Sequence, residues 1–562
     1  MELAITCGVI LLVICYAVIR GSIDEKRRKE TYQRRLKEQY GKFPDREYQT
    51  EDLESIPRLF QHKRAELSYE VDDITWNDLD MDKVFMMLNH TQSSSGAEYL
   101  YYMLRAPRMT EEGLDDWEKH VTYFMKEEKQ RVTIQMLLHD LGRTGRFSLF
   151  DYLDYLETLE KQDNKKEIVA LLLLVISIIL VFANTSLGVV CMLFVMCYQI
   201  ATYLKAKKKV LPYLSSFTYI MRMIDCAEKI CQEKLTDMSE YKQELKTCLE
   251  SLSQFKKGYH ILMQMNYTTG NPVELLIEYF KMITHLDLMQ FNRTLNQVQG
   301  NQQKIEELAQ QIGYLDTVIA VGAFRESLPY YCVPTLSKEA KELCLEEGYH
   351  PAIRDAVPNS FRQKRGMLVT GSNASGKSTF LKMAAINTIL AQTIHTCAAK
   401  AYEGNYFRIY SSMALRDSLE SGESYYIVEI KALKRIMDAA ADNTLQNPLL
   451  CFVDEVLRGT NTVERIAAST KILEKLSKEQ VFCFAATHDI ELTHVLEAQY
   501  DNFHFEEEIK DGDVLFSYHL KEGRAVSRNA IRLLQVIGFD ETVIQSADKM
   551  AANFMETGEW RS

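Results

Sequence analysis

A glycine-rich segment with the spacing GxxxxGKS contains the residues best suited to bind phosphate groups. It consists of Gly371, Ser372, Asn373, Ala374, Ser375, Gly376, Lys377 and Ser378, and Thr379 follows it. The run before it predicts a strand and the run after it a helix, so the glycines can turn backbone amides, and the helix its positive dipole end, toward phosphates. The spacing therefore predicts a P-loop, in which Lys377 reaches the β- and γ-phosphates of a nucleotide and Ser378 binds Mg²⁺.

Two adjacent carboxylates supply the acidic partner that a P-loop requires. Asp454 and Glu455 end the apolar run Leu449–Val453, which predicts a buried strand. We expect Asp454 to hold Mg²⁺, directly or through water, and Glu455 to orient or deprotonate the attacking water. The alternative, an ordinary strand that ends in exposed acids, is weakened by the presence of the P-loop.

A histidine follows another apolar run. Val481–Ala485 predicts a strand, and Ala486, Thr487 and His488 come directly after it. Because ligands of open α/β sheets bind beyond the carboxyl ends of the strands, His488 is expected to sense the γ-phosphate or to position water. A purely structural histidine is the alternative.

These residues lie where short β-rich runs alternate with helical ones. The runs are Met367–Thr370, Phe407–Tyr410, Leu449–Val453, Val481–Ala485 and Val514–His519. The alternation predicts an α/β domain with a largely parallel sheet over residues 331–528. Residues 77–160 and 205–330 have helical periodicity with a break at Gly270–Pro272, and residues 529–562 predict a C-terminal helical segment.

An apolar run at the N-terminus predicts a membrane anchor. Leu3–Ile19 is followed, not preceded, by the basic segment Arg20–Lys42, which is the reverse of a secretory signal. We interpret residues 1–20 as an uncleaved anchor with its N-terminus outside, and residues 21–76 as a basic juxtamembrane linker.

A second apolar region predicts a helical hairpin in the membrane. Residues 167–204 are too long for one span, and the polar triplet that begins at Asn184 divides them. Lysines precede and follow the region, so both ends are expected inside. The chain is then a multi-pass cell-membrane protein with residues 205–562 in the cytoplasm. A buried hairpin in a soluble protein is the alternative.

Composition limits the other functions. The 562 residues carry a net charge of −12, which does not indicate a protein that binds nucleic acid chiefly by neutralising phosphates. The 12 cysteines have no paired CxxC spacing, which favours buried thiols in a reducing compartment over disulfides or metal ligands.

The motifs together resemble those of the MutS family. The similar segments, in the family's order, are Gly348–Pro351, Thr370–Thr379, Arg408–Leu419, Ser421–Ser424 with Glu429, Asp454–Glu455, Arg458–Thr462 and Ala486–Leu492. A weaker similarity covers Leu88–Gly96 and Leu104–Pro107, which resemble the start of the MutS core helical domain. The chain is most similar to membrane-bound, truncated members of the family.

The resemblance implies a mixed fold: transmembrane helices, an all-α core and lever domain (77–160 and 205–330), and an α/β P-loop ATPase domain of the ABC/MutS type. It implies ATP and Mg²⁺ as ligands and a homodimer braced by residues 529–562. Each subunit then contacts its partner's nucleotide through Arg458, Gly459, Thr460, Asn461 and Thr462. Repair members usually carry Ser where this chain has Asn461.

The motifs are compatible with more than one class of biological ligand. The expected mismatch-reading domain and DNA clamp are not evident, so a DNA-coupled membrane ATPase competes with an ATP-gated membrane scaffold that binds protein or lipid. A transporter, suggested by Ser421-Gly422-Glu423, is the third alternative. Tyr349 and Phe361 are weak candidates for contact with adenine.

Overall fold

The computed structural model describes two compact units, which we treat separately. It describes residues 20, 23–24, 26–144, 147–158, 163–253, 279–372, 375–413, 425–442, 446–457, 460–510, 513–525, 531, 534 and 538–557. Unit 1 contains Met1–Glu66, Leu88–Tyr102 and Asp116–Ser327, and unit 2 contains Leu67–Met87, Met103–Asp115 and Leu328–Ser562. The predicted anchor Leu3–Ile19 lies outside the described residues.

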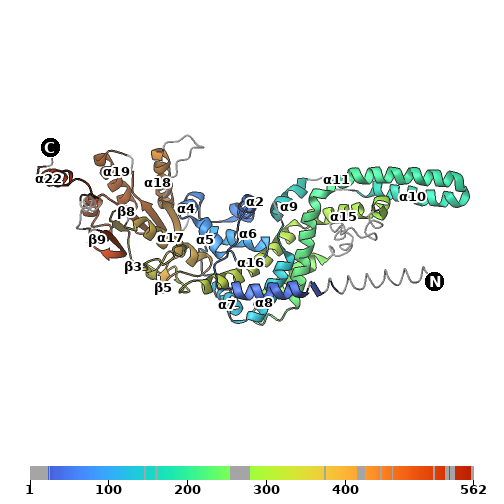
Figure 1. Cartoon of the computed structure of the whole chain (residues 1–562), viewed down its shortest axis with the longest axis horizontal. Coiled ribbons are helices and arrows are strands. Elements are labelled where there is room, and N and C mark those ends of the chain that lie inside the picture. The colour runs from blue at the N-terminus through green and yellow to red at the C-terminus, as the bar shows by residue number, and fades with distance from the viewer. Residues whose placement is uncertain are drawn as a thin grey trace. The chain divides into compact units, whose positions relative to one another are not determined.

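Unit 1 is helical throughout its described part (Figure 1). Residues 26–39 are helical, and the elements that follow are α2 (Thr50–Ser55), α3 (Arg58–Lys63), η1 (Arg64–Glu66), α6 (Ser94–Arg105), α7 (Leu114–Lys126), α8 (Glu128–Leu141), α9 (Leu149–Thr158), α10 (Lys165–Ala183), α11 (Thr185–Gln232), α12 (Ser239–Ser251), α15 (Leu286–Gly300) and α16 (Gln302–Ser327). The predicted linker 21–76 therefore contains helices, and the predicted break Gly270–Pro272 lies outside the described residues.

Helix α16 is the centre of unit 1, and it fixes the start of α6. Its Asp316 is almost fully buried and accepts hydrogen bonds from the backbone amides of Gln92 and Ser93 and from the Ser93 hydroxyl. A Cβ at Gly96 would lie 2.2 Å from Asp316 Oδ2, and a Cβ at Gly313 would lie 2.5 Å from the Ser95 carbonyl oxygen. The segment Thr91–Gly96, which resembles the family's core motif, thus serves close helix packing and capping of α6.

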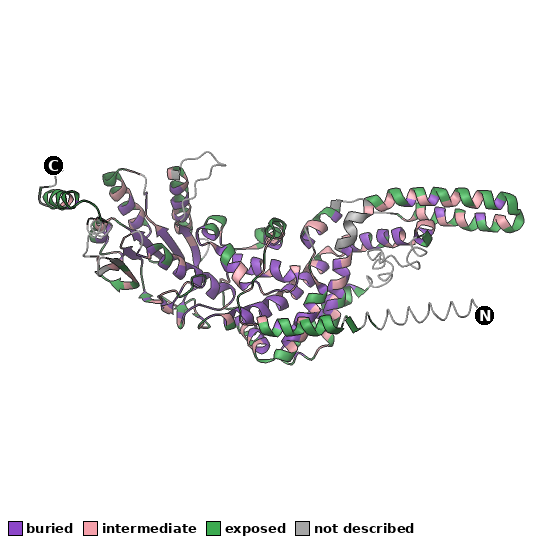
Figure 2. Cartoon of the chain, in the orientation of Figure 1, coloured by how far each residue is buried: buried purple, intermediate pink, exposed green. Residues whose placement is uncertain are grey.

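Helices α10 and α11 form a hairpin that turns at Asn184. The Asn184 side chain caps α11 by accepting a hydrogen bond from the Leu187 amide at 3.2 Å. Two described helical stretches, Lys165–Ala183 and Thr185–Lys208, are long and apolar enough to cross a membrane by length and composition. Figure 2 shows them mostly exposed, in contrast to the buried α16.

Unit 2 contains two sheets. The larger has the order β10-β9-β4-β8-β7-β6 and consists of β4 (Met367–Thr370), β6 (Arg408–Ser412), β7 (Leu449–Asp454), β8 (Val481–Thr487), β9 (Asp501–Lys510) and β10 (Asp513–Glu522). Only β10 is antiparallel to its neighbour. The smaller sheet has the order β1-β5-β2-β3, formed by β1 (Thr335–Leu336), β2 (Leu343–Gly348), β3 (Asn359–Gln363) and β5 (Ala401–Gly404).

Helices cover the larger sheet according to the alternation of its strand residues. Leu449, Cys451 and Val453 of β7 pack in one core cluster with residues of α18, α19 and α20, whereas Phe452 faces the other way toward Phe484. The helices of unit 2 are α4 (Asp73–Asp78), α5 (Met81–Leu88), α17 (Lys377–Thr393), α18 (Tyr425–Ala441), α19 (Thr462–Lys475), α20 (Ile490–Val495) and α22 (Glu541–Thr557).

The edge strand β6 is covered by a segment from much earlier in the chain. The Tyr69 hydroxyl donates to the Ile409 carbonyl at 2.5 Å and accepts from the Ile409 amide at 2.6 Å. The Asp78 carboxylate of α4 accepts hydrogen bonds from the Ser411 hydroxyl and the Met413 amide. Covering an exposed edge prevents it from pairing with another chain. Residues 67–87 therefore belong to the α/β unit, although their helical pattern gave no sign of this.

The predicted strands all coincide with observed ones to within a few residues. The long strand β9 was not predicted, because its second half, Glu506-Glu507-Glu508, has no apolar alternation. Within the predicted C-terminal helical segment 529–562, Glu541–Thr557 form α22, while most of residues 529–537 lie outside the described part of the chain.

Candidate nucleotide site

The register of the larger sheet brings the predicted site residues to one edge. Thr370 of β4 pairs with Thr487 of β8, and Asp454 of β7 pairs with Ala486 of β8. Because these strands are parallel, their carboxyl ends lie side by side. The P-loop, the Asp454–Glu455 pair and His488 each follow one of these ends, so all three lie together.

The loop after β4 requires glycine at two positions. Gly371 has φ +146° and Gly376 has φ +103°, conformations that L-residues with side chains rarely adopt. A Cβ at Gly371 would lie 2.7 Å from Ser375 Oγ, which donates to the Ser372 carbonyl at 2.8 Å. Helix α17 begins directly after Gly376, so its N-terminus points to the loop. Asn373 and Ala374 lie outside the described residues.

Lys377 is buried, with 3% of its surface exposed, and its ammonium turns back over the loop. Its Nζ donates to the carbonyl oxygens of Gly371 and Ser372, both at 2.7 Å, and lies 3.3 Å from His488 Nε2. The ammonium thus lies at the loop, where the lysine of a P-loop contacts the phosphates of a nucleotide.

The two predicted magnesium ligands are in direct contact. Ser378 Oγ donates to Asp454 Oδ2 at 2.5 Å. A hydroxyl and a carboxylate oxygen are hard ligands that suit Mg²⁺, which keeps several waters and takes phosphate oxygens for the remaining positions. Among the described residues no cluster of three or more His, Cys, Asp or Glu side chains could hold a metal by itself. The pair therefore fits Mg²⁺ that arrives with a nucleotide.

Glu455 and His488 form a second pair beside the first. Glu455 Oε1 lies 2.7 Å from His488 Nε2. Glu455 has a left-handed backbone with φ +60°, and its amide donates to the Ala486 carbonyl at 3.0 Å. This unfavourable conformation turns the carboxylate away from the strand direction and toward β8. Strained non-glycine backbone of this kind is often associated with function.

The turn after Glu455 is held by a buried acid from another helix. Glu429 of α18 accepts a hydrogen bond from the amide of Leu457, whose φ is +58°. The sequence singled out Glu429 only by resemblance, and the structure gives it a supporting contact with the strained turn.

The residues predicted to act on a partner's nucleotide are only partly described. Arg458 and Gly459 lie outside the described residues. Asn461 caps α19, because its side-chain oxygen accepts from the Val463 amide at 2.9 Å. Thr462 begins that helix and is exposed. Thr460, Asn461 and Thr462 are not among the residues that line the cavity described next.

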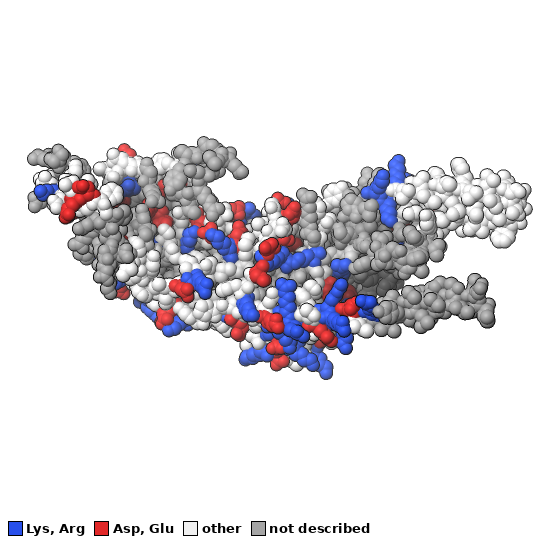
Figure 3. Space-filling model, in the orientation of Figure 1, with Lys and Arg blue, Asp and Glu red and all other residues white. Residues whose placement is uncertain are grey.

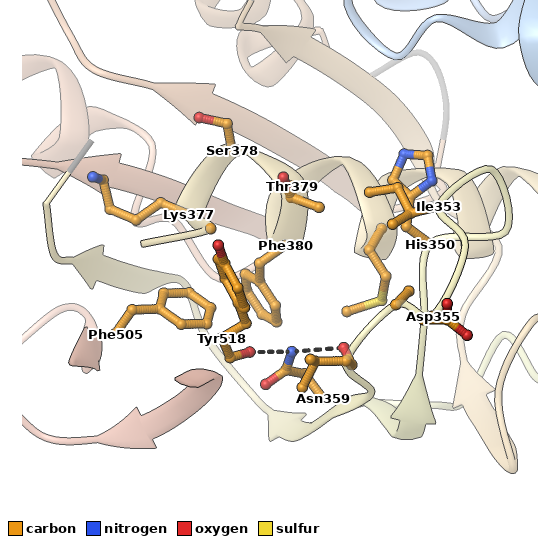
Figure 4. Close-up of a pocket in the computed structure, with 14 residues that line it drawn as sticks. His350, Ile353, Asp355, Asn359, Lys377, Ser378, Thr379, Phe380, Phe505 and Tyr518 are labelled. Atoms are coloured by element: carbon orange, nitrogen blue, oxygen red, sulfur yellow. Dashed lines mark hydrogen bonds between the residues drawn. The ribbon is translucent and has the colours of Figure 1, made fainter. Parts of the chain in front are cut away.

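A cavity of about 470 Å³ adjoins the P-loop (Figure 4). Its walls are formed by Gly376, Lys377, Ser378, Thr379, Phe380 and Met383 from the loop and α17, by Phe505 and Tyr518 from β9 and β10, and by His350, Ile353, Asp355, Ala356, Val357 and Asn359. In Figure 4, Phe505 and Tyr518 lie near Lys377, and His350, Ile353 and Asp355 lie at the other side of the cavity. This combination suits a molecule with a polyphosphate and a flat ring.

Tyr518 is placed at the cavity by a bulge. The pairing of β9 with β10 shifts between Phe516 and Leu520, and Tyr518 has φ +56°. The side chain of Asn359 holds both flanks, since it donates to the Tyr518 carbonyl at 3.0 Å and accepts from the Leu520 amide at 2.7 Å. The Tyr518 ring stands against Gly376, where an added Cβ would lie 3.1 Å from it.

The weak candidates for adenine contact lie elsewhere. Tyr349 is buried and its hydroxyl donates to the Tyr330 carbonyl at 2.7 Å. Phe361 packs edge-on against Phe380 and Phe484, at 5.6 and 5.5 Å between ring centroids. Neither residue lines the cavity, so Tyr518 replaces them as the aromatic candidate.

His350 lines the far end of the cavity as a neutral imidazole. Burial, together with the neighbouring Lys382, lowers the pKa of His350 to about 4. Its Nδ1 accepts a hydrogen bond from the Ala352 amide at 3.2 Å.

The sequence did not predict two supporting contacts. Ser372 Oγ donates to Glu507 at 2.5 Å, and Arg465 forms a two-pronged ion pair with Asp489 at 2.9 and 2.6 Å. Asp489 follows His488 directly, so its acid could have been noticed. Nothing in the sequence indicated that Arg465 of α19 or Glu507 of β9 would meet these loops.

Comparison with known proteins gives one answer for this region. Residues 367–555 match the family model of MutS domain V. The C-terminal region is thus similar to MutS domain V. The similarity indicates an ATPase domain, in agreement with the cavity and the phosphate-binding loop.

Similar curated proteins carry mismatch-repair names. "DNA mismatch repair protein MutS 2" of Haloarcula marismortui is 27% identical over 288 residues, which cover 46% of this chain and 30% of that protein. The MutS of Persephonella marina is 29% identical, covering 50% and 33%, and that of Bacillus subtilis is 29% identical, covering 50% and 34%. The chain thus spans about a third of the length of the curated relatives it matches.

Proposed function

We propose that the chain is an ATPase that binds Mg·ATP in the cavity beside the P-loop. The observation that carries this is the meeting of Lys377, Ser378, Asp454, Glu455 and His488 at the carboxyl edge of one sheet. Lys377 and the loop amides bind the β- and γ-phosphates, and Tyr518 stacks on the adenine. Ser378 and Asp454 hold Mg²⁺, which when bound neutralises phosphate charge.

The pair of Glu455 and His488 carries out the hydrolytic step in this proposal. Glu455 accepts a proton from the attacking water, and its hydrogen bond with His488 fixes the direction of the carboxylate. His488 also lies beside Lys377 Nζ, so it links the water-activating group to the group that contacts the γ-phosphate. General base catalysis of this kind typically contributes about 10²–10⁴-fold to a rate.

Removal of the base separates binding from turnover. Glu455→Gln in the whole detergent-solubilised chain is expected to keep ATP binding and to lose about 10²-fold or more of the ATPase rate. Lys377→Ala is expected to lose ATP binding itself. Glu479→Gln, which changes an exposed acid outside the site, is the matched control and should keep both. Turnover by Glu455→Gln at the unsubstituted rate would contradict the assignment.

We further propose that the α10–α11 hairpin spans a cell membrane, with the ATPase domain in the cytoplasm. Large apolar side chains on both helices are exposed, including Phe182 at 88%, Phe194 at 76% and Val190 at 65%. Charged side chains of the hairpin gather at its base, where Glu167 accompanies the lysines, and residues 168–204 carry none (Figure 3). Apolar exposure with basic residues at one end is typical of a membrane hairpin with its ends inside.

We propose the partners of the chain from its similarity to the mismatch-repair proteins. The mismatch-repair names of the relatives favour a role that couples ATP to DNA, and the resemblance of the motifs implies a homodimer. The alternative is a membrane scaffold that binds protein or lipid, which the exposed hairpin and the net charge of −12 favour. We would measure the ATPase rate with and without duplex, branched and single-stranded DNA, at low and physiological salt. Stimulation that fades with salt supports the DNA role, and no response to any form favours the scaffold.

A further inference from the structure

The hairpin is a regular antiparallel pair whose charged end can be located. Gln199 Nε2 donates to the Ala170 carbonyl at 2.6 Å, and a Cβ at Gly188 would lie 2.3 Å from the Val181 amide nitrogen. The two contacts follow one antiparallel pairing of the two helices. Extending this pairing along the hairpin places the start of α10 beside Leu204. The lysines at this level, which we call the lysine ring, are Lys165, Lys166, Lys205, Lys207 and Lys208.

A segment from much later in the chain lies against the hairpin on the apolar side of this ring. Asn164, at the base, donates to the Met289 carbonyl at 3.1 Å, and the Tyr203 hydroxyl donates to Asp287 at 2.6 Å. His285 Nε2 lies 3.0 Å from the Gln199 carbonyl oxygen, to which it can donate. Met289 therefore contacts the base of the hairpin, whereas His285 contacts Gln199, which lies farther from the base. Residues 279–284 are helical and precede His285, whose backbone is left-handed with φ +55°.

The polarity of residues 279–285 is the reverse of a helix in water. The polar side chains Lys281, Thr284 and His285 are buried, with 4%, 8% and 5% of their surfaces exposed. Tyr279 and Phe280 are exposed at 56% and 58%. A helix that packs on a soluble core turns its aromatic residues inward and its lysines outward. This segment instead exposes aromatic rings and buries polar side chains, of which His285 contacts the hairpin.

The level of the segment matches the boundary of a bilayer. Gln199 precedes Lys205 by six residues, so His285 lies about 9 Å beyond the lysine ring at 1.5 Å per helical residue. Tyrosine and other aromatic rings concentrate at this depth, next to the headgroups. Lysines at the base are attracted to anionic headgroups at the cytoplasmic surface. Tyr279 and Phe280 are exposed and lie in the helical turns just before His285, which contacts the hairpin.

We propose that residues 279–285 are a third membrane-contacting element, which places Tyr279 and Phe280 in the interfacial zone of an anionic phospholipid bilayer. The proposal rests on the membrane insertion of the hairpin proposed above. It differs from the expectation that everything after residue 205 lies in the cytoplasm, because in this proposal the chain returns to the bilayer between α12 and α15.

Tryptophan quenching by brominated lipid tests the depth of this segment. The whole chain is reconstituted into vesicles of phosphatidylcholine and phosphatidylglycerol in equal parts, with or without bromine on the acyl chains. Three variants each add one tryptophan: Phe280→Trp in the segment, Leu193→Trp on the exposed face of the hairpin, and Phe539→Trp on an exposed site of unit 2. The emission of the unsubstituted chain is subtracted, and ATPase activity checks the fold of each variant.

The three positions separate the two proposals. We expect the added emission of Phe280→Trp and Leu193→Trp to be blue-shifted and strongly quenched by brominated lipid, and that of Phe539→Trp to be unchanged. Quenching at Leu193 without quenching at Phe280 overturns the third element and leaves the hairpin in the membrane. Absence of quenching at both overturns membrane insertion and this proposal with it. If Phe280→Trp does not fold, Tyr279→Trp gives the same reading.

Discussion

The unusual backbone of Tyr518 gives this residue a testable role. A left-handed tyrosine at a strand bulge costs free energy, and Asn359 holds both sides of the bulge in place. The result is a ring that stands over the end of the P-loop. Such an arrangement is expected where a flat ligand must be stacked.

Tyr518→Ala is expected to raise the KM for ATP about 10-fold with a smaller effect on kcat, because stacking on a base is worth about 1–3 kcal/mol. Steady-state ATPase kinetics of the whole chain measure both constants. Tyr518→Phe keeps the ring and should restore the KM. An unchanged KM in Tyr518→Ala would show that the base binds elsewhere.

Close packing between α6 and α16 depends on the absence of a side chain at Gly313. A Cβ there would lie 2.5 Å from the Ser95 carbonyl oxygen and 2.7 Å from Tyr99 Cβ. Because the first of these is backbone, the helices themselves must move apart to accept it. The same elements carry the hydrogen bonds from Ser93 to Asp316, so a shift would disturb these as well.

Gly313→Ala is expected to lower the free energy of unfolding of unit 1 by about 1–3 kcal/mol, the usual cost of overpacking. Gly300→Ala is the matched control, since nothing lies within 4 Å of its added Cβ and alanine favours a helix. Hydrogen exchange of peptides from α6 and α16 measures both variants. Equal exchange in the two would contradict the packing argument.

Unit 1 also contains a buried acid that makes its stability depend on pH. Burial raises the pKa of Glu98 to about 8 from an ordinary 4.5, although the hydrogen bond from Ser148 lowers it in part. A raised folded-state pKa means that the stability contribution is complete below pH 4.5 and is lost as the pH rises through 8. Glu98 therefore favours the folded state while it remains protonated.

We expect the free energy of unfolding of unit 1 to fall between pH 6 and 8 by at most about 1.4 kcal/mol per pH unit from this group. Hydrogen exchange of α6, corrected for the intrinsic effect of pH, measures the fall. Glu98→Gln keeps a partner for Ser148 but does not titrate, so its profile should be flatter. A parallel fall in the variant would assign the pH dependence to other groups.

For the whole molecule, the exposed hairpin decides whether the chain is held in a membrane. Leu193→Lys places a charge on its apolar surface, at a cost of about 2.5–3.5 kcal/mol for a residue near the centre of a membrane helix. We expect a larger fraction of this variant to be released by alkaline carbonate. Val495→Lys, at an exposed position of α20, should stay with the membrane fraction. Equal release of the two variants would count against insertion.

The sequence by itself determined the local features of the nucleotide site. Gly371, Gly376 and Lys377 could be recognised because a phosphate loop needs fixed backbone conformations and a cation at fixed spacing. Asp454, Glu455 and His488 could be placed at one edge because parallel strands end on the same side. The hairpin at Asn184 followed from the lengths of its two apolar stretches.

Only the tertiary structure decided which distant segments meet. The assignment of residues 67–87 to the α/β unit, the Tyr518 bulge and the Arg465–Asp489 pair depend on contacts between residues that are far apart in sequence or on different elements. The same is true of residues 279–285, whose helical periodicity looked ordinary. Periodicity reports that one face of a helix differs from the other, but only the neighbour of each face shows whether it turns toward protein, water or lipid.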